Sequence, residues 1–143
     1  MIEIRQMKVD DLDQVVAIEK ESFSMPWTRE GLLTFLNRGD TCYLVAEKRG
    51  EILGYCGYVQ VIDEADILNV AVKTMYRGQH IGTKMIQRLI EEGKKRGAYR
   101  FTLEVRQSNF PAIHVYEKLG FVSAGIRKNF YEKPTENAVI MWK

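Results

Sequence analysis

A short basic loop between an apolar strand and an amphipathic helix carries the residues best suited to bind an anion. The stretch LNVAVKTMYRGQHIGTKM runs from Leu68 to Met85, and we expect its helix to begin near Ile81. The first turn of a helix presents unpaired N–H groups and partial positive charge, so this helix start offers an anion site made of backbone. Arg77 adds a positive charge that can meet a phosphate. The predicted phosphate-binding residues are Arg77, Gly78, Gln79, His80, Ile81, Gly82 and Thr83.

The spacing within this loop excludes two common phosphate motifs. A Walker A loop needs four residues between its glycines followed by Lys-Ser/Thr, whereas three residues separate Gly78 from Gly82 and Thr83-Lys84 have the reverse order. The pattern G-x-G-x-x-G is also absent. A plain structural turn is the alternative interpretation of the loop.

A second candidate residue, Glu104, lies in the predicted strand 101–105. Alternate residues of a strand point to opposite faces, which places Glu104 on a polar face with Thr102 and Arg106. A central strand covered by helices on both faces would be apolar throughout. Glu104 is therefore expected to face a cleft or an exposed end of the strand. The alternative is a solvated glutamate on an open sheet face.

The loop resembles a known coenzyme site. YRGQHIGTKMIQRLI is similar to the acetyl-CoA pyrophosphate motif Q/R-x-x-G-x-G/A of the GNAT superfamily of N-acetyltransferases. The sequence departs from this motif at His80, which occupies the position of the first glycine. Because backbone N–H groups make the phosphate contacts, we expect His80 to be tolerated there with dihedral angles in the helical region.

A longer stretch of the sequence resembles one particular group within this superfamily. FTLEVRQSNFPAIHVYEKLGF closely resembles the LEVRxSNxxAxxLYExLGF segment of RimI-type alanine N-acetyltransferases, which acetylate the amino terminus of a small-subunit ribosomal protein. FSMPWT, DEADILNVAV, GIRKNFY and AVIMW resemble the same group. The resemblance implies that Glu104 is the general base and Tyr116 the general acid. It also implies contacts to acetyl-CoA from Asn109 and from the backbone of Val70, Ala71 and Val72.

The implied reaction transfers acetyl from acetyl-CoA to the N-terminal alanine of protein eighteen of the small ribosomal subunit, without a metal. An α-amino group has a pKa of about 7.7–8.0 and must lose its proton before it attacks the thioester. Glu104 could accept that proton directly or through water, and Tyr116 could protonate the leaving thiolate. Direct attack in a ternary complex is expected, because neither cysteine lies in the site segments. The alternatives are acetylation of lysine side chains or other N-termini, and a non-catalytic acetyl-CoA-binding module.

The elements that position these residues follow from hydrophobic periodicity and helix caps. We expect a single domain, 1–143, of α/β class (α+β by some schemes), with a mixed, mostly antiparallel twisted sheet flanked by helices and the order βααβββαβαββ. The helix between strands 66–72 and 101–105 implies a parallel pair, whereas the hairpin 42–62 is antiparallel. Predicted helices begin after Asp10 or Asp11, after Thr28, near Ile81 and after Asn109.

The segment FSMPW, residues 23–27, separates the first two predicted helices. Pro26 disfavours helix at Met25, and we expect Phe23 and Trp27 to pack in the core. The resemblance implies that this segment also borders the groove for the acceptor peptide.

Composition narrows the class of protein. A net charge of +2 in 143 residues is too balanced for a nucleic-acid binder with a strongly basic face. The first residues carry acids where a signal peptide is apolar, and no stretch approaches a membrane span. Cys42 and Cys56 lack metal or redox spacing and are expected to be buried, reduced thiols. We therefore expect a cytoplasmic protein without nucleic-acid or membrane partners.

Overall fold

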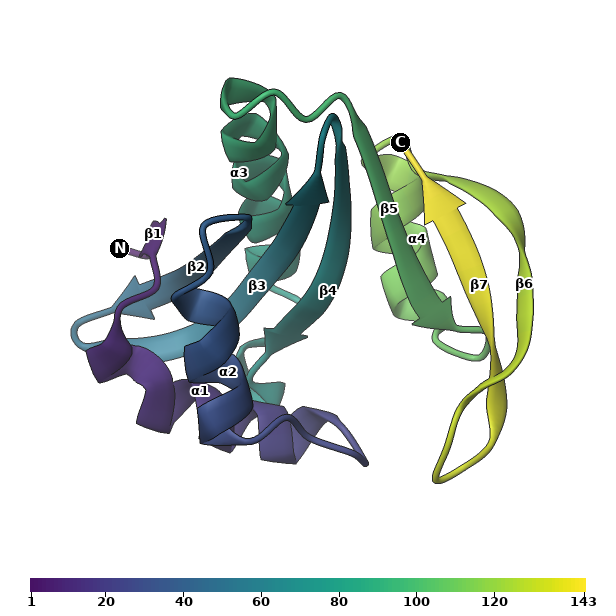
Figure 1. The fold of residues 1–143 in the computed structure, drawn as a ribbon. Coiled ribbons are helices and arrows are strands. Elements are labelled where there is room, and N and C mark those ends of the chain that lie inside the picture. Colours follow the sequence, from purple (N-terminus) through teal and green to yellow (C-terminus); the bar gives the residue numbers. More distant parts are fainter.

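The computed structural model describes residues 1–143 and has one seven-stranded sheet with helices on both faces (Figure 1). The strand order is β1-β2-β3-β4-β5-β7-β6. The strands are β1 (Glu3–Gln6), β2 (Thr41–Lys48), β3 (Glu51–Val61), β4 (Glu64–Val72), β5 (Arg100–Arg106), β6 (Val122–Tyr131) and β7 (Glu136–Trp142). The helices are α1 (Leu12–Ser22), α2 (Arg29–Leu36), α3 (Ile81–Lys95) and α4 (Phe110–Lys118), with short 3-10 turns η1 (Val9–Asp11) and η2 (Thr74–Tyr76).

The predicted fold class and element order are confirmed. Only β4 and β5 run parallel, and every other neighbouring pair is antiparallel. The structure extends the predicted strand 121–128 to Tyr131, so β6 and β7 form a longer hairpin than the sequence indicated. No helix is long and apolar enough to cross a membrane.

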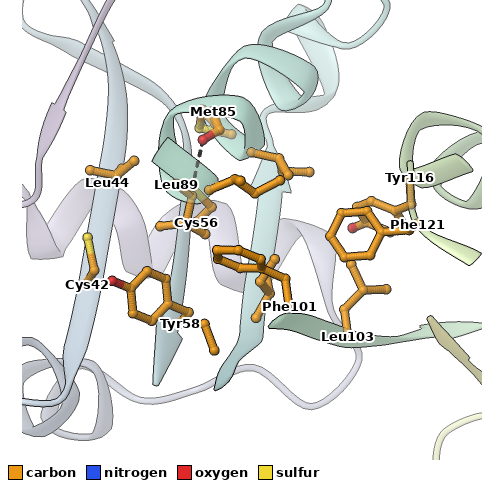
Figure 2. Packing of buried hydrophobic residues seen from close by; sticks show 14 of the residues in the cluster. Cys42, Leu44, Cys56, Tyr58, Met85, Leu89, Phe101, Leu103, Tyr116 and Phe121 are labelled. Atoms are coloured by element: carbon orange, nitrogen blue, oxygen red, sulfur yellow. Dashed lines mark hydrogen bonds between the residues drawn. The ribbon is translucent and has the colours of Figure 1, made fainter. Parts of the chain in front are cut away.

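Two cores lie on opposite faces of the sheet. Alternate residues of β2 supply them: Leu44 belongs to the cluster under α3 and α4, whereas Val45 belongs to the cluster under α1 and α2. The predicted apolar stripe of α3 is buried, and Figure 2 shows Met85 and Leu89 close to Cys56. Both cysteines are buried and free, as expected.

Small residues and caps explain how α3 and α2 are placed. A Cβ at Gly93 would lie 2.7 Å from Cε1 of Phe101, so a glycine lets β5 approach α3. The predicted Thr28 cap is confirmed, because its side chain accepts a hydrogen bond from the Gly31 N–H at 3.1 Å. α3 ends before Gly97, whose φ of 89° is the left-handed conformation that terminates helices.

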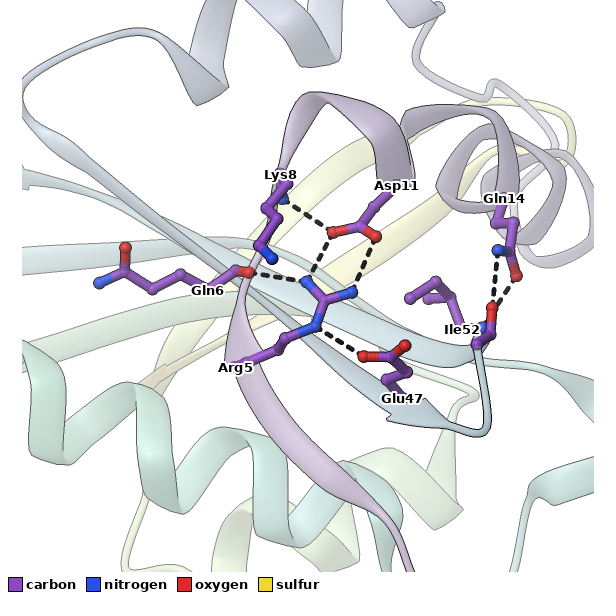
Figure 3. Close-up of polar contacts among 8 residues, drawn as sticks. Arg5, Gln6, Lys8, Asp11, Gln14, Glu47 and Ile52 are labelled. Atoms are coloured by element: carbon purple, nitrogen blue, oxygen red, sulfur yellow. Dashed lines mark hydrogen bonds and ion pairs between the residues drawn. The ribbon is translucent and has the colours of Figure 1, made fainter.

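Two expectations near the N-terminus are wrong. Asp11 precedes α1 but does not cap it with its side chain. Its carboxylate instead accepts two hydrogen bonds from Arg5, at 2.8 and 2.9 Å, and one from the Lys8 N–H (Figure 3). The bond from Arg5 is the main reason that the pKa of Asp11 is lowered. Phe23 is 39% exposed rather than part of the core, whereas Trp27 packs on Phe35 at 4.6 Å between ring centroids.

A bulge in β4 separates β4 from β5. Against β3, Gly57 pairs with Asn69 and Tyr58 pairs with Ile67, so Leu68 has no partner. A bulge bends its strand and strengthens the twist. The parallel pairing of β4 with β5 stops at Ile67 and Leu103, and Figure 1 shows the two strands diverging beyond that point.

Candidate active site

The edge of β4 that β5 leaves behind offers free backbone groups. The Lys73 N–H donates to the Leu53 carbonyl at 2.8 Å, which makes this a hydrogen-bonded pair between β3 and β4. In an antiparallel ladder such pairs alternate, so Asn69 and Ala71 also face β3. The peptide groups of Val70 and Val72 therefore point toward the side from which β5 has diverged. The Val72 carbonyl accepts a hydrogen bond from Nε of Arg77 at 3.1 Å.

Glu104 lies on β5 immediately after the last residue that pairs with β4. Its neighbours Leu103 and Val105 belong to the core under α3, so its side chain points to the opposite face, as the alternation predicted. That side chain is 20% exposed, and its Oε1 lies 3.9 Å from Nε of Arg127 on β6. No hydrogen bond within the protein engages the carboxylate. Glu104 is thus available to accept a proton.

Asp66 is a second acid on the same face, and sequence reasoning missed it. It stands opposite Thr102 in the β4–β5 register, two residues before the level of Glu104. Burial, followed by the charges of Glu104 and Glu64, raises the pKa of Asp66 to about 6 against the opposing effect of Arg127. Its Oδ1 is enclosed without a hydrogen-bond partner. An acid at the start of the mostly apolar run DILNVAV was the signal that could have identified it.

Tyr116 lies in the core on the other face of the sheet. It lies on α4, is 8% exposed, and packs edge to face on Phe121 with 5.9 Å between ring centroids. Figure 2 shows both rings beside Leu103. Its hydroxyl makes no hydrogen bond, yet it is not fully enclosed, unlike the hydroxyls of Tyr55 and Tyr58. Burial raises the pKa of Tyr116, which keeps the phenol protonated.

Tyr131, at the end of β6, links the two predicted catalytic residues. Burial, with a smaller contribution from the charge of Glu104, raises the pKa of Tyr131 to about 12. Tyr131 in turn helps to raise the pKa of Tyr116. Tyr131 on β6 therefore interacts electrostatically with Glu104 on β5 and with Tyr116 on α4.

The loop before α3 has an unexpected backbone conformation. His80 has φ 63° and ψ 19°, which is left-handed, so the expectation of right-handed helical angles is wrong. Gly78 is also left-handed, with φ 83°. These two residues turn the chain sharply into α3. The Lys84 N–H bonds to the His80 carbonyl at 3.1 Å, and the preceding amides of α3 have no acceptor within the protein.

The N-terminal ends of α3 and α4 both present hydrogen-bond donors. The free amides at the start of α3 belong to Ile81, Gly82 and Thr83, which are three of the predicted phosphate-binding residues. Asn109 caps α4, because its Oδ1 accepts from the Ala112 N–H at 3.3 Å. The side-chain NH2 of Asn109 makes no hydrogen bond and is exposed.

The 23–27 segment and the turn between β6 and β7 meet at the end of the sheet where β4 and β5 separate (Figure 1). Ser24 Oγ donates to the Glu132 carbonyl at 3.3 Å. Arg106 holds this turn by donating to the carbonyls of Pro134 and Glu132 at 2.9 and 3.0 Å. Its guanidinium also lies 4.6 Å from the centroid of the Tyr131 ring. Both segments therefore border the face that carries Glu104.

Two shallow hollows of about 370 and 300 Å³ lie elsewhere. They share Thr41 and Arg96, beyond the C-terminal end of α3, and contain none of the predicted site residues. The free backbone groups of β4 and the acids Glu104 and Asp66, near the point where β4 and β5 diverge, are the stronger indication of a functional site.

Comparison with known proteins gives a consistent result. Residues 12–121 match the Acetyltransferase (GNAT) family. A protein of Bacillus subtilis (strain 168), provisionally named a [ribosomal protein bS18]-alanine N-acetyltransferase, is 44% identical over 140 residues, which are 97% of this chain and 93% of that protein. The [ribosomal protein bS18]-alanine N-acetyltransferase of Escherichia coli (strain K12) is 36% identical over 144 residues, covering 96% of this chain and 94% of that one.

A solved structure extends the likeness to three dimensions. The crystal structure of the ribosomal-protein-S18-alanine N-acetyltransferase from Escherichia coli superposes with a TM-score of 0.91 at 33% sequence identity. The match covers 99% of this chain and 92% of that chain.

Proposed function

Since the chain belongs to the Acetyltransferase (GNAT) family, we propose that it transfers the acetyl group of acetyl-CoA to the N-terminal α-amino group of a protein. The proposed acceptor is the N-terminal alanine of ribosomal protein bS18, which the names of the Bacillus subtilis and Escherichia coli relatives state as the substrate. The observation that carries the proposal is the divergence of β4 from β5 between the free edge at Val70–Val72 and Glu104.

Acetyl-CoA, the acetyl donor, is proposed to lie along the loop before α3 and between the diverging ends of β4 and β5. Free amides at the start of α3 suit the pyrophosphate, and the exposed Arg77 adds positive charge beside them. The outward N–H and carbonyl groups of Val70 suit an amide of the pantetheine arm, much as a neighbouring strand would pair with them. Asn109, with its free NH2 group, is a further donor toward this side.

Glu104 is proposed as the general base. The acceptor amine loses its proton to the carboxylate, directly or through one water, and its lone pair then attacks the thioester carbonyl carbon. A carboxylate without a hydrogen-bond partner in the protein keeps both oxygens free for this step. The N–H of Val72, at the outward edge of β4, is the proposed donor to the developing oxyanion.

Tyr116 is proposed as the general acid. When the carbon–sulfur bond breaks, the thiolate of CoA takes a proton from the phenol. Burial holds the pKa of Tyr116 above its ordinary value, so the proton is present on the phenol at neutral pH. Glu104 and Tyr116 lie on opposite faces of the sheet, and in this proposal the base and the acid act on opposite sides of the same carbonyl carbon.

The pKa values of amines favour an α-amine as acceptor. An N-terminal amine has an ordinary pKa about 2.5 units below that of a lysine, so far more of it is neutral at pH 7. The 23–27 segment and the β6–β7 turn, joined by Ser24 and Glu132, border the approach to Glu104. We propose that a free chain end enters there more readily than a lysine flanked by backbone on both sides.

The test compares two peptides of the same sequence, one beginning with a free alanine and containing internal lysines, the other blocked at its N-terminus. After incubation with acetyl-CoA and enzyme, mass spectrometry should find acetyl on the α-amine of the free peptide and none on the blocked one. Lysine acetylation of the blocked peptide at a comparable rate would support the lysine-acetyltransferase alternative. Binding of acetyl-CoA without any turnover would support a non-catalytic module.

A further inference from the structure

A buried polar row crosses the sheet beneath α1, just before β4 diverges. Tyr43, Gly57 and Asn69 stand side by side on β2, β3 and β4. A Cβ on Gly57 would come within 2.2 Å of the Tyr43 ring, so this glycine leaves room for the ring to cross the middle strand. The Tyr43 hydroxyl thereby donates to Oδ1 of Asn69 at 2.9 Å.

Glu19 of α1 extends this row toward the 23–27 segment. Its side chain is only 1% exposed, and its Oε2 accepts a hydrogen bond from the Trp27 N–H at 2.8 Å. Burial raises the pKa of Glu19, against the smaller lowering effect of the Trp27 N–H. The other oxygen, Oε1, is enclosed and has no hydrogen-bond partner.

A carboxylate buried this deeply lowers stability, because an apolar side chain of the same size would fill the space without desolvating a charge. Its presence therefore indicates a role that depends on its contacts. The contact to Trp27 fixes the point where the 23–27 segment joins α2, and α1, which carries Glu19, packs against β4. Glu19 therefore connects the segment that borders the acceptor side to the strand edge that borders the donor side.

We propose that Glu19 is a positioning residue for the acceptor, holding the 23–27 segment at a set place relative to the diverging part of β4. The inference rests on the proposed function, because that function assigns the segment to the acceptor side. Glu19 does not touch the reacting atoms, so its loss should weaken acceptor binding and leave donor binding intact.

Two substitutions of similar size separate the role of the acceptor oxygen from that of packing. Glu19→Met fills the space without an acceptor for the Trp27 N–H, whereas Glu19→Gln keeps one carbonyl oxygen. Glu19→Met should raise the KM for an alanine-initiated peptide by about tenfold or more, with an unchanged KM for acetyl-CoA. Glu19→Gln should lie closer to the native enzyme. Lys20→Ala, at the exposed neighbouring position, is the matched control and should change neither KM.

Hydrogen exchange followed by NMR tests the contact without reference to activity. In Glu19→Met the Trp27 amide should exchange at least tenfold faster than in the native protein, while the core amides of α3 keep their rates. This result would stand even if N-terminal acetylation failed, so the two proposals can be judged separately.

Two outcomes would overturn the inference. One is a folded Glu19→Met enzyme with native peptide KM and a native exchange rate at Trp27. The other is an equal rise of the KM for both substrates, which would indicate a general loss of structure. If Glu19→Met does not fold, Glu19→Asp, whose shorter side chain withdraws the acceptor from the Trp27 N–H, must show the same selective rise in peptide KM, and its absence would equally reject the proposal.

Discussion

Nε of Arg127 lies 3.9 Å from Oε1 of Glu104, at the outer limit of an ion pair. The Arg127 side chain is 57% exposed, so solvent weakens the attraction, and exposed pairs of this kind stabilise a protein by about 0–1 kcal/mol. Glu104 therefore has little structural role in the fold. Its placement at the point where β4 and β5 separate is better explained by chemistry.

Glu104→Gln tests that chemistry. The substitution keeps the shape but removes the base, and kcat should fall by about 10²–10⁴-fold. The affinity for acetyl-CoA, measured by calorimetry, should be unchanged, and so should the thermal unfolding midpoint. Arg127→Met is the comparison variant, since it removes the weak partner but leaves the carboxylate, and its loss of kcat should be much smaller. A native rate in Glu104→Gln with a slowly reacting peptide would exclude the general-base role.

Tyr116→Phe tests the proton donor. The variant keeps the ring that packs on Phe121 and removes a hydroxyl that makes no hydrogen bond, so stability should change by less than about 0.5 kcal/mol. Turnover should be slower at every pH assayed, because burial raises the pKa of Tyr116 and the native phenol keeps its proton through the neutral range. Stopped-flow measurement of the acetyl-transfer step checks this, and an unchanged rate would assign the proton to another donor.

Arg77→Ala tests the phosphate site. The substitution should raise the KM for acetyl-CoA by the equivalent of about 1.5–3 kcal/mol if the guanidinium contacts a phosphate. Arg77→Lys distinguishes two explanations: recovery would indicate a need for charge alone, whereas no recovery would indicate the bond from Nε to the Val72 carbonyl. Lys94→Ala, at the other end of α3, is the control. Native affinity in Arg77→Ala for both CoA and acetyl-CoA would place the phosphates elsewhere.

His80→Gly should retain activity and gain stability. A left-handed conformation is unfavourable for a residue with a Cβ, and glycine adopts it freely, so unfolding free energy should rise by up to about 1 kcal/mol. Urea unfolding and the KM for acetyl-CoA are the two measurements. A collapse of turnover in a stable variant would show that the imidazole itself takes part.

Asp66→Asn tests this half-buried acid through the pH dependence of stability. The pKa of Asp66 in the folded protein is about 6, above its ordinary 3.8, so its contribution to stability is present below pH 4 and lost as pH rises through 6. At pH 8 the variant should therefore be more stable than the native protein, by about 1–2 kcal/mol after allowance for solvent screening. Below pH 4 the difference should vanish. Urea unfolding at pH 4 and pH 8 measures both values, and a difference that does not depend on pH would contradict this assignment.

Local patterns in the sequence determined most of the elements. The stripe from Ile81 to Ile90, the caps at Thr28 and Asn109, and the alternation around Glu104 depend on residues within a few positions of one another. Hydrophobic periodicity and capping act over that range, so they can be read from one segment at a time. The helix between two strands likewise predicted the parallel pair β4–β5.

The tertiary structure decided where the chemistry lies. The bulge at Leu68 is visible only in the pairing of β4 with β3, and it separates β4 from β5. Asp66 and Tyr131 come near Glu104 through register across strands that are far apart in the sequence. Segment patterns do not contain that register, because it depends on how several strands and turns pack at once. For the same reason the left-handed conformation of His80 could not be predicted, because it depends on the path of the chain from η2 to the start of α3.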